Sequence, residues 1–516
     1  MFHFQKRLLI AAMLLPAAVA AQNSDFVHKA DHSDIERIFN ISLGSENPAF
    51  IGRNTFSSLA DIKIGYAHSS GSFHDVDDGK VINGMNFDFY GVKKLGKLAF
   101  EGSFSYDYSS LNNRNWNSTL FVSSDNPFKI SDRVESDFTN EVFRLNGGVS
   151  YDISDRWALG LRADYLAGSS ANETDPRPEI DGMRFRISPG ATYKTGSFTF
   201  GLAGHAELLS ESTDYTVVRT TVSHIAYLMQ GLSQPVQRQA LSYSRKYNGH
   251  ELGGSAQMEW KNDALGNFLE IGYAKNQETA KDNELQGKYR GGKYSRNSYF
   301  LKDRVMFGSN RLRHQIYASA RYNEVNGTTY EQKQTSDMNG NTYWEVLSSA
   351  VTYKNKYADA CIGYRADYLT SDKAPKATGE ISAGMHTEKA DEYPDGYFQK
   401  FTTGYVDVDA KYRFNVRRAY LIANLGAKFN ARISDSQELQ GTSYDNIYLT
   451  PKYEYAAAEY YRVRARIDAH LPLKIKGLRT WIGIYAAYSY TGYNGSSATL
   501  ENSSRNNVDT GVRLIF

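Results

Sequence analysis

The last nine residues of the chain, VDTGVRLIF at positions 508–516, show the pattern that decides the fold. Apolar side chains and one threonine occupy every second position: Val508, Thr510, Val512, Leu514 and Phe516. Charged or small residues fill the positions between Val508 and Leu514: Asp509, Gly511 and Arg513. Successive side chains of a β-strand point to opposite faces, so this alternation predicts a strand with one apolar and one polar face.

The same alternation recurs from about residue 58 onward. In the segment 98–108, for example, Leu98, Phe100 and Phe104 share the face opposite to Glu101 and Asp107. The pattern predicts about 18 strands, with about 16 as the alternative count. They lie at 58–69, 85–95, 97–110, 140–153, 157–170, 183–195, 197–212, 251–262, 267–280, 294–308, 312–327, 344–354, 357–371, 402–415, 419–433, 455–471, 480–493 and 507–516.

Very short turns fall at every second connection, as they must if they all lie on one side of a membrane. They are 94–97, 154–156, 194–197, 262–267, 308–311, 354–356, 415–418 and 472–479. This order predicts short periplasmic turns and long extracellular loops. One alternating segment, residues 376–387, breaks the up-and-down order and is assigned to a long loop.

Composition separates a membrane barrel from a soluble β-sandwich, which would contain similar strands. The 516 residues include 38 Tyr, 26 Phe and 42 Gly but only 11 Pro, a balance that favours strands and tight turns. Aromatic residues gather at the ends of the apolar faces, as in an interfacial girdle. The mean hydropathy of −0.53 agrees with a barrel, because lipid-facing and water-facing residues alternate. We therefore predict an all-β fold, a transmembrane antiparallel β-barrel.

Other classes of protein find little support in the sequence. The 59 basic and 57 acidic residues are spread evenly, which argues against a nucleic-acid partner. The single cysteine, Cys361, excludes an internal disulfide and is predicted to fill space on an inward face. Residues 74–79 resemble the opening of a calcium loop, but Asn86 stands where the bidentate acid belongs, so an ordinary acidic turn is favoured. We expect no enzyme, no catalytic residue, no metal and no cofactor.

The start of the chain has the features of a processing signal. Lys6 and Arg7 precede an apolar run at 8–15, and small residues follow at 18–21. We predict a cleaved signal peptide at 1–21, a periplasmic N-terminal segment at 22–56, and a barrel at 57–516.

The polar faces of the strands point into the predicted lumen, where charged residues can be hydrated. Ten residues are candidates for lining it: Arg144, Arg162, Asp164, His205, Glu207, Arg365, Asp367, Arg462, Arg464 and Arg466. Two interpretations stay open. The charges either filter solutes in a polar pore, or form interlocked ion pairs that fill the barrel and conduct little.

The connection 214–249 is the most unusual loop of the sequence. Ile225, Leu228, Met229 and Leu232 follow helical spacing and predict a short amphipathic helix. This helix would constrict the barrel mouth, form a docking surface outside it, or simply cover a neighbouring loop.

Three features resemble known families. The ending on Phe516 resembles the C-terminal strand of outer-membrane proteins, which implies recognition by the barrel-assembly machinery. Asn47-Pro48-Ala49 resembles the N-terminal signature of FadL-like hydrophobic-compound transporters and of accessory barrels of a gliding-type secretion system. The whole layout resembles uncharacterised outer-membrane barrel families of Gram-negative bacteria, known only as domains of unknown function.

Two functions follow from this reading. The first is a porin-like channel or transporter for small solutes in the outer membrane. The alternative is a non-conducting barrel that serves as a scaffold or accessory subunit of an assembly, secretion or uptake complex. The expected partners are outer-membrane lipid, the barrel-assembly machinery, and other outer-membrane proteins or lipoproteins.

Overall fold

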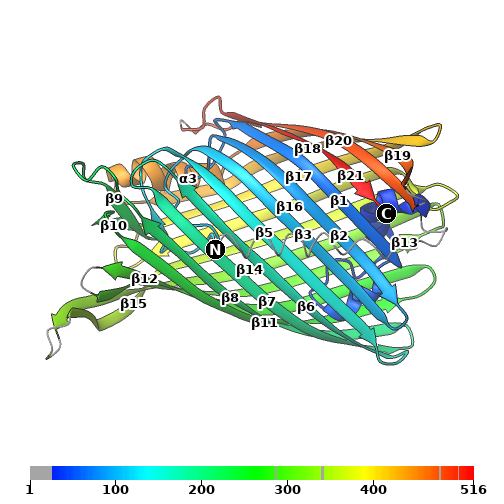
Figure 1. Ribbon diagram of the computed structural model, residues 1–516, viewed down its shortest axis with the longest axis horizontal. Helices are drawn as coiled ribbons and strands as arrows, with labels where there is room; N and C mark the ends of the chain where they lie inside the picture. The colour runs from blue at the N-terminus through cyan, green and yellow to red at the C-terminus, as the bar shows by residue number, and fades with distance from the viewer. Residues whose placement is uncertain (1–25, 285–286, 337, 339–341, 476–477, 498) are drawn as a thin grey trace.

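The computed structural model describes residues 26–284, 287–336, 338, 342–475, 478–497 and 499–516, so the predicted signal peptide at 1–21 lies outside the described residues. Within the described residues, 18 strands form one antiparallel sheet that closes into a barrel (Figure 1), which confirms the predicted fold. The strands are β1 (Ser58–Gly71), β2 (Val81–Leu95), β3 (Leu98–Arg114), β5 (Ser136–Asp152), β6 (Trp157–Asn172), β7 (Pro178–Thr195), β8 (Phe198–Tyr215), β11 (Ser244–Lys261), β12 (Leu265–Glu284), β13 (Gly287–Gly308), β14 (Leu312–Ser336), β15 (Thr342–Leu369), β16 (Pro375–Glu392), β17 (Phe398–Val416), β18 (Ala419–Glu438), β19 (Tyr460–Ile475), β20 (Leu478–Tyr493) and β21 (Ser504–Ile515).

The C-terminal strand closes the ring. β21 pairs with β20 on one side and with β1 on the other, where Lys63 stands opposite Arg513. Phe516 extends this pairing, because its N–H donates to the carbonyl of Ala60 at 2.8 Å. Each of the 18 described strands therefore has two neighbours, which satisfies the backbone groups as a membrane-spanning sheet requires.

Large apolar side chains point away from the barrel axis. Leu202 of β8 and Leu425 of β18 are 69% and 63% exposed, while their neighbours along each strand point inward. Exposed apolar surface costs roughly 25 cal/mol per Å² in water but nothing comparable in hydrocarbon. The outer face therefore suits a lipid environment. Among the described residues, the helices are all too short or too polar to cross a membrane.

One predicted turn and one predicted loop are wrong. β15 runs straight through residues 354–356, and the turn lies at 370–374, so that residues 375–392 form β16. Asparagine is frequent in turns, but here Asn355 and the lysines on either side of it continue the alternation of a long strand. The side chain of Asn355 donates to Glu388 inside the barrel at 2.7 Å, and the ammonium of Lys354 lies 5.1 Å from the ring of Tyr393. The two errors cancel, so the strand count of 18 stands.

The amphipathic helix predicted within 214–249 is also wrong. Residues 225–239 form a hairpin of β9 (Ile225–Gln230) and β10 (Ser233–Gln239), joined through Gly231 at φ +68°. β9 also pairs with the short strand β4 (Ile130–Ser131). Glycine accepts the positive φ of this tight turn without strain. A strand, unlike a helix, needs a neighbouring strand for its backbone hydrogen bonds, and β4 provides one for β9.

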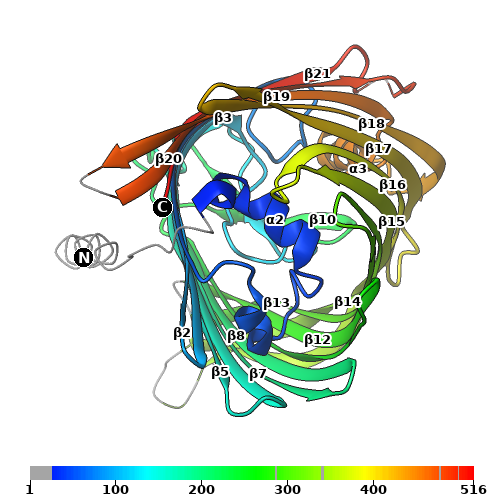
Figure 2. The ribbon, with the colours of Figure 1, turned by 90° about the vertical axis from the view of Figure 1, so that its right-hand side faces the viewer.

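Short helices lie at the two ends of the barrel. The 3₁₀-helix η2 (Phe26–Asp31), the α-helix α2 (His32–Phe39) and the 3₁₀-helix η3 (Pro48–Arg53) form an inner segment, defined here as residues 26–57. Figure 2 shows α2 inside the ring of strands. The π-helix η4 (Asp445–Leu449) and α3 (Thr450–Ala456) lie at the opposite end, near β9 and β10 (Figure 1).

Candidate functional site

The ten predicted lumen residues lie on inward faces, and each interacts with another polar side chain. Most interactions are ion pairs between strands or two residues apart on one strand. They are Arg144–Asp107 at 2.6 Å, Arg162–Glu101 at 3.7 Å, Asp164 with Asn146, His205–Glu251 at 3.1 Å, Glu207–Arg184 at 2.6 Å, Arg365–Asp367 at 2.8 Å, Arg462 with Thr491 at 2.9 Å, Arg464–Asp407 at 2.5 Å and Arg466–Asp468 at 2.7 Å.

The middle of the lumen is accessible to water. The side chains of Arg144 on β5 and Asp359 on β15 are 58% and 54% exposed. Their strand neighbours Leu145 and Ile362 are exposed on the lipid side, so Arg144 and Asp359 face inward. An inward side chain of a closed barrel remains accessible only if the interior around it is unfilled. A chamber lined by both signs of charge thus lies between the two ends.

The inner segment is attached to the wall by ion pairs. Asp34 of α2 lies 3.4 Å from Arg365 and 2.5 Å from Lys411. Asp31 pairs with Arg413 at 2.8 Å, with both residues buried. The predicted lumen residue Arg365 therefore holds α2 in place, a role that depends on long-range contacts and could not be inferred from the strand pattern.

The Asn47-Pro48-Ala49 motif packs against glycines of the wall. The side-chain nitrogen of Asn47 donates to the carbonyls of Ala191 and Leu202 at 3.0 and 3.2 Å. A Cβ at Gly160 would overlap the backbone of Pro48 and Ala49, and a Cβ at Gly190 would overlap the side chain of Asn47. Only glycine at these positions lets the motif approach the strands so closely. The motif could be identified from the sequence, but its position inside the barrel could not.

At the other end, three connections pack together; we call residues 115–135, 216–243 and 439–459 the outer loops. They share an apolar cluster that also includes inward side chains of the strands. Leu228, Met229 and Leu232 are buried in this cluster, whereas Ile225 is half-buried at the start of β9. The ring of Trp116 contacts those of Tyr444 and Tyr448, with centroids 5.8 and 5.2 Å apart. The outer loops thus form a small folded unit at the mouth.

Buried carboxylates of the wall hold the first outer loop. Glu211 accepts hydrogen bonds from the backbone N–H groups of Leu120 and Val122, at 3.0 and 3.1 Å, and from that of Phe121 between them. Glu278 accepts from the hydroxyl of Ser123 at 2.6 Å. Neither glutamate was a predicted site residue, because its partners lie about 90 to 155 residues away in the sequence.

A further carboxylate on this loop reaches two strands, β13 and β15. Asp125 accepts from the hydroxyls of Tyr294 and Tyr357 at 2.8 and 2.9 Å and lies 3.5 Å from Arg296. The loop is therefore fixed by charge-assisted hydrogen bonds, which are about twice as strong as neutral ones.

The acidic turn at 74–79 binds a lysine. The ammonium of Lys452 in α3 lies 3.1 Å from Asp75 and 2.7 Å from Asp77. Burial alone would lower the pKa of Lys452, but Asp77 and Asp75 hold it well above its usual range. The calcium-like opening thus serves to attach α3 to the loop between β1 and β2. Within the described part of the chain, there is no group of three or more His, Cys, Asp or Glu side chains that could hold a metal.

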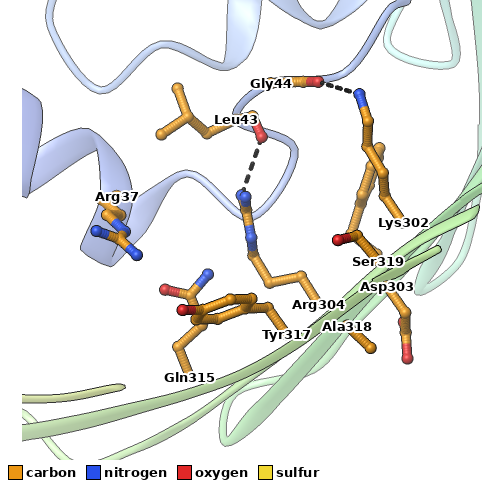
Figure 3. A pocket seen from close by; sticks show the side chains of 11 residues that line it. Arg37, Leu43, Gly44, Lys302, Asp303, Arg304, Gln315, Tyr317, Ala318 and Ser319 are labelled. Atoms are coloured by element: carbon orange, nitrogen blue, oxygen red, sulfur yellow. Dashed lines mark hydrogen bonds between the residues drawn. The ribbon is translucent and has the colours of Figure 1, made fainter. Parts of the chain in front are cut away.

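A cavity of about 260 Å³ separates the inner segment from the wall (Figure 3). Arg37, Leu43 and Gly44 line it on one side, and residues of β12, β13 and β14 on the other. Arg304 of β13 crosses the gap and donates to the carbonyl of Leu43 at 3.0 Å.

The closed ring, the apolar outer face and the hydrated lumen define a β-barrel of the outer-membrane type. Residues 48–516 match the model of a family of unknown function, DUF6850, and the chain belongs to this family. The resemblance predicted from the overall layout is thereby confirmed. No curated protein sequence matches the chain.

Several solved structures align with most of the chain at low sequence identity. A FadL homologue of Pseudomonas aeruginosa shares 11% identity at a TM-score of 0.37, over 97% of this chain and 98% of that one. The ferric yersiniabactin uptake receptor FyuA of Yersinia pestis shares 10% identity at a TM-score of 0.40, over 88% and 80% of the two chains. The copper transporter OprC shares 10% identity at a TM-score of 0.40, over 89% of this chain and 80% of that one.

Proposed function

We propose that this protein resides in the outer membrane and passes small polar solutes through its lumen, with the inner segment and the outer loops as gates. The observation that carries the proposal is the hydrated chamber around Arg144 and Asp359, which lies between two obstructing elements. A pure scaffold has no need for unfilled space in its core, since packed interiors are more stable.

The way in which the gates are held supports this function. The inner segment is attached to the wall both by buried ion pairs, such as Asp34 to Arg365 and Asp31 to Arg413, and by apolar contacts of Ile35, Phe56 and Phe50 with the strands. Breaking a buried ion pair costs about 3 to 5 kcal/mol, so the segment moves only when another anion, such as a charged solute in the lumen, takes the place of its carboxylates on these arginines.

Single-channel recording in planar bilayers tests the proposal. We expect low or intermittent conductance for the intact chain. Deletion of residues 216–243 should raise it, and replacement of residues 26–57 by a short glycine-serine linker should raise it further. Absence of conductance in the variant that lacks both elements would refute passage through the lumen.

A non-conducting scaffold is the second candidate. The dense ion pairs of the wall, with Arg464 bound to both Asp407 and Asp409, would also stiffen a barrel that only displays its loops. Stable co-purification of a second outer-membrane protein or lipoprotein after gentle detergent extraction, together with absent conductance, would favour this function.

A further inference from the structure

The cavity at the inner end of the lumen carries an excess of positive charge. It is lined by three cationic side chains, Arg37, Lys302 and Arg304, and by one carboxylate, that of Asp303. Arg37 is paired with Glu380 at 2.5 Å and Lys302 with Glu46 at 3.2 Å. Arg304, in contrast, donates to backbone carbonyls and has no carboxylate within 4.0 Å among the described residues. One cationic side chain of the cavity thus lacks an anion.

Two polar atoms beside the cavity are buried without a hydrogen-bond partner among the described residues: Nε of Arg304 and Oε1 of Gln315. The Gln315 residue is only 3% exposed. Unsatisfied polar groups in a buried place cost about 1 to 3 kcal/mol each, so native proteins keep few of them. Figure 3 shows Arg37, Gln315 and Arg304 around the same space.

The rest of the lining is mixed, with Asp303 and Ser319 as its other polar side chains. Leu43, Phe268 and the ring of Tyr317 border the cavity. Its volume of about 260 Å³ falls just below the range of roughly 300 to 1,000 Å³ that is usual for drug-sized ligands. The space therefore fits a small molecule with one apolar part and one anionic group.

We propose that this cavity binds a small organic carboxylate, with Arg304 and Arg37 as the groups that recognise the anion. A guanidinium presents two parallel N–H groups that match the two oxygens of a carboxylate. The free oxygen of Gln315 accepts a hydrogen bond from a hydroxyl on the same ligand. The inference rests on the proposed function and narrows it to anionic solutes, with this cavity as a site at the inner end of their path.

The site also connects the gate to the wall. Arg37 belongs to the inner segment, while Arg304 belongs to β13. A bound carboxylate contacts both, so its presence changes the balance of charge that holds the inner segment against the strands.

Calorimetric titration of the purified full chain in detergent micelles tests the site, with sodium benzoate as the probe and benzylamine hydrochloride as its cation of equal shape. We expect saturable binding of benzoate and at least about tenfold weaker binding of benzylamine. Arg304→Gln should weaken benzoate binding by about tenfold or more, and Arg304→Lys less, because the charge remains but the planar fork is lost.

Arg304 also donates to carbonyls of the inner segment, so a second variant separates binding from folding. Arg37→Gln leaves those contacts intact and should also weaken benzoate binding. Arg177→Gln removes an arginine of the connection between β6 and β7, which is paired with Asp175 outside the cavity, and this variant should bind benzoate as the wild type does. Equal affinity for benzoate and benzylamine, or unchanged affinity in both Arg304→Gln and Arg37→Gln, would overturn the proposal.

The two proposals can fail separately. If the chain conducts ions after removal of the gates but does not bind benzoate, the proposed channel stands and the proposed binding site is refuted. If the chain binds benzoate through Arg304 but never conducts ions, the proposed binding site stands and the proposed channel is refuted.

Discussion

The carboxylate of Glu211 accepts the backbone hydrogen bonds of residues 120–122, which a helix or a strand would direct to backbone carbonyls. Three consecutive N–H groups of an irregular loop find their acceptor in this one side chain. Glutamine offers one acceptor oxygen instead of two and places its NH₂ against a donor. Glu211→Gln should therefore destabilise the loop 115–135 by about 1 to 3 kcal/mol.

Hydrogen exchange of the amides of residues 120–123 measures this effect. Asp107→Asn, which alters a wall carboxylate paired with the exposed Arg144, serves as the matched control and should leave these amides unchanged. Equal exchange in Glu211→Gln and wild type would show that the carboxylate does not hold the loop.

Asp132 gives the outer loops a dependence on pH. Burial raises the pKa of its carboxyl from 3.8 to about 6, although a hydrogen bond from the backbone of Val134 works against this shift. Because the folded loop holds its proton more tightly than the unfolded one, the stabilisation is complete below about pH 4. It declines as the pH rises and is lost above about pH 6. The shift corresponds to about 3 kcal/mol at most.

The amide of Trp116, which donates to the carbonyl of Asp132 at 2.9 Å, reports on this change. After correction for intrinsic exchange, its protection should fall between pH 4 and pH 8 in the wild type and much less in Asp132→Asn. A parallel fall in both proteins would assign the pH dependence to another group.

Among the elements, the strands and most of the short turns were predictable, whereas the structure of the long connections was not. Alternation is a local property of the sequence, so the start of β1 at 58 and of β6 at 157 followed from it directly. The boundary between β15 and β16 did not follow from the alternation. The segment 354–356 was predicted as a turn, although its lysines lie on the outward face of an extended strand. The hairpin of β9 and β10 was not predicted for another reason. Its partner β4 lies about 95 residues earlier in the chain, and a local period of the sequence does not indicate such a pairing.

The inner segment depends on the glycines that face it. Substitution of Gly190 by valine places a side chain where Asn47 now lies, so the segment should detach while the strands remain paired. We expect trypsin to cut at Arg37 and Arg53 in folded Gly190→Val protein and to spare both sites in the wild type. Conductance should rise in the same variant.

Gly147→Ala is the matched control, since a Cβ at Gly147 meets nothing within 4 Å. It should keep the protease resistance of the wild type. Resistance in Gly190→Val would mean that the motif does not need its close approach to the wall.

On the scale of the whole molecule, a single principle organises both faces of the sheet. The outer face is apolar because hydrocarbon cannot hydrate a charge, and the inner face is polar because a hydrated lumen can. The ten inward residues were therefore identifiable from the sequence as a set. Their partners were not, because the pairing of charges across the lumen depends on register and on the position of the inner segment, as with Arg365 and Asp34.

Two adjacent residues of β5 test this principle directly. Leu145 is 50% exposed on the outer face, whereas Asn146 points inward and donates to Asp164. Leu145→Arg moves a charge into hydrocarbon and should lower the free energy of unfolding in lipid vesicles by about 2 to 4 kcal/mol. Asn146→Arg places the same charge beside an acid in the hydrated lumen and should change the stability far less. Urea titration in vesicles measures both, and equal losses in the two variants would contradict the assignment of the faces, and with it the barrel as a membrane-spanning structure.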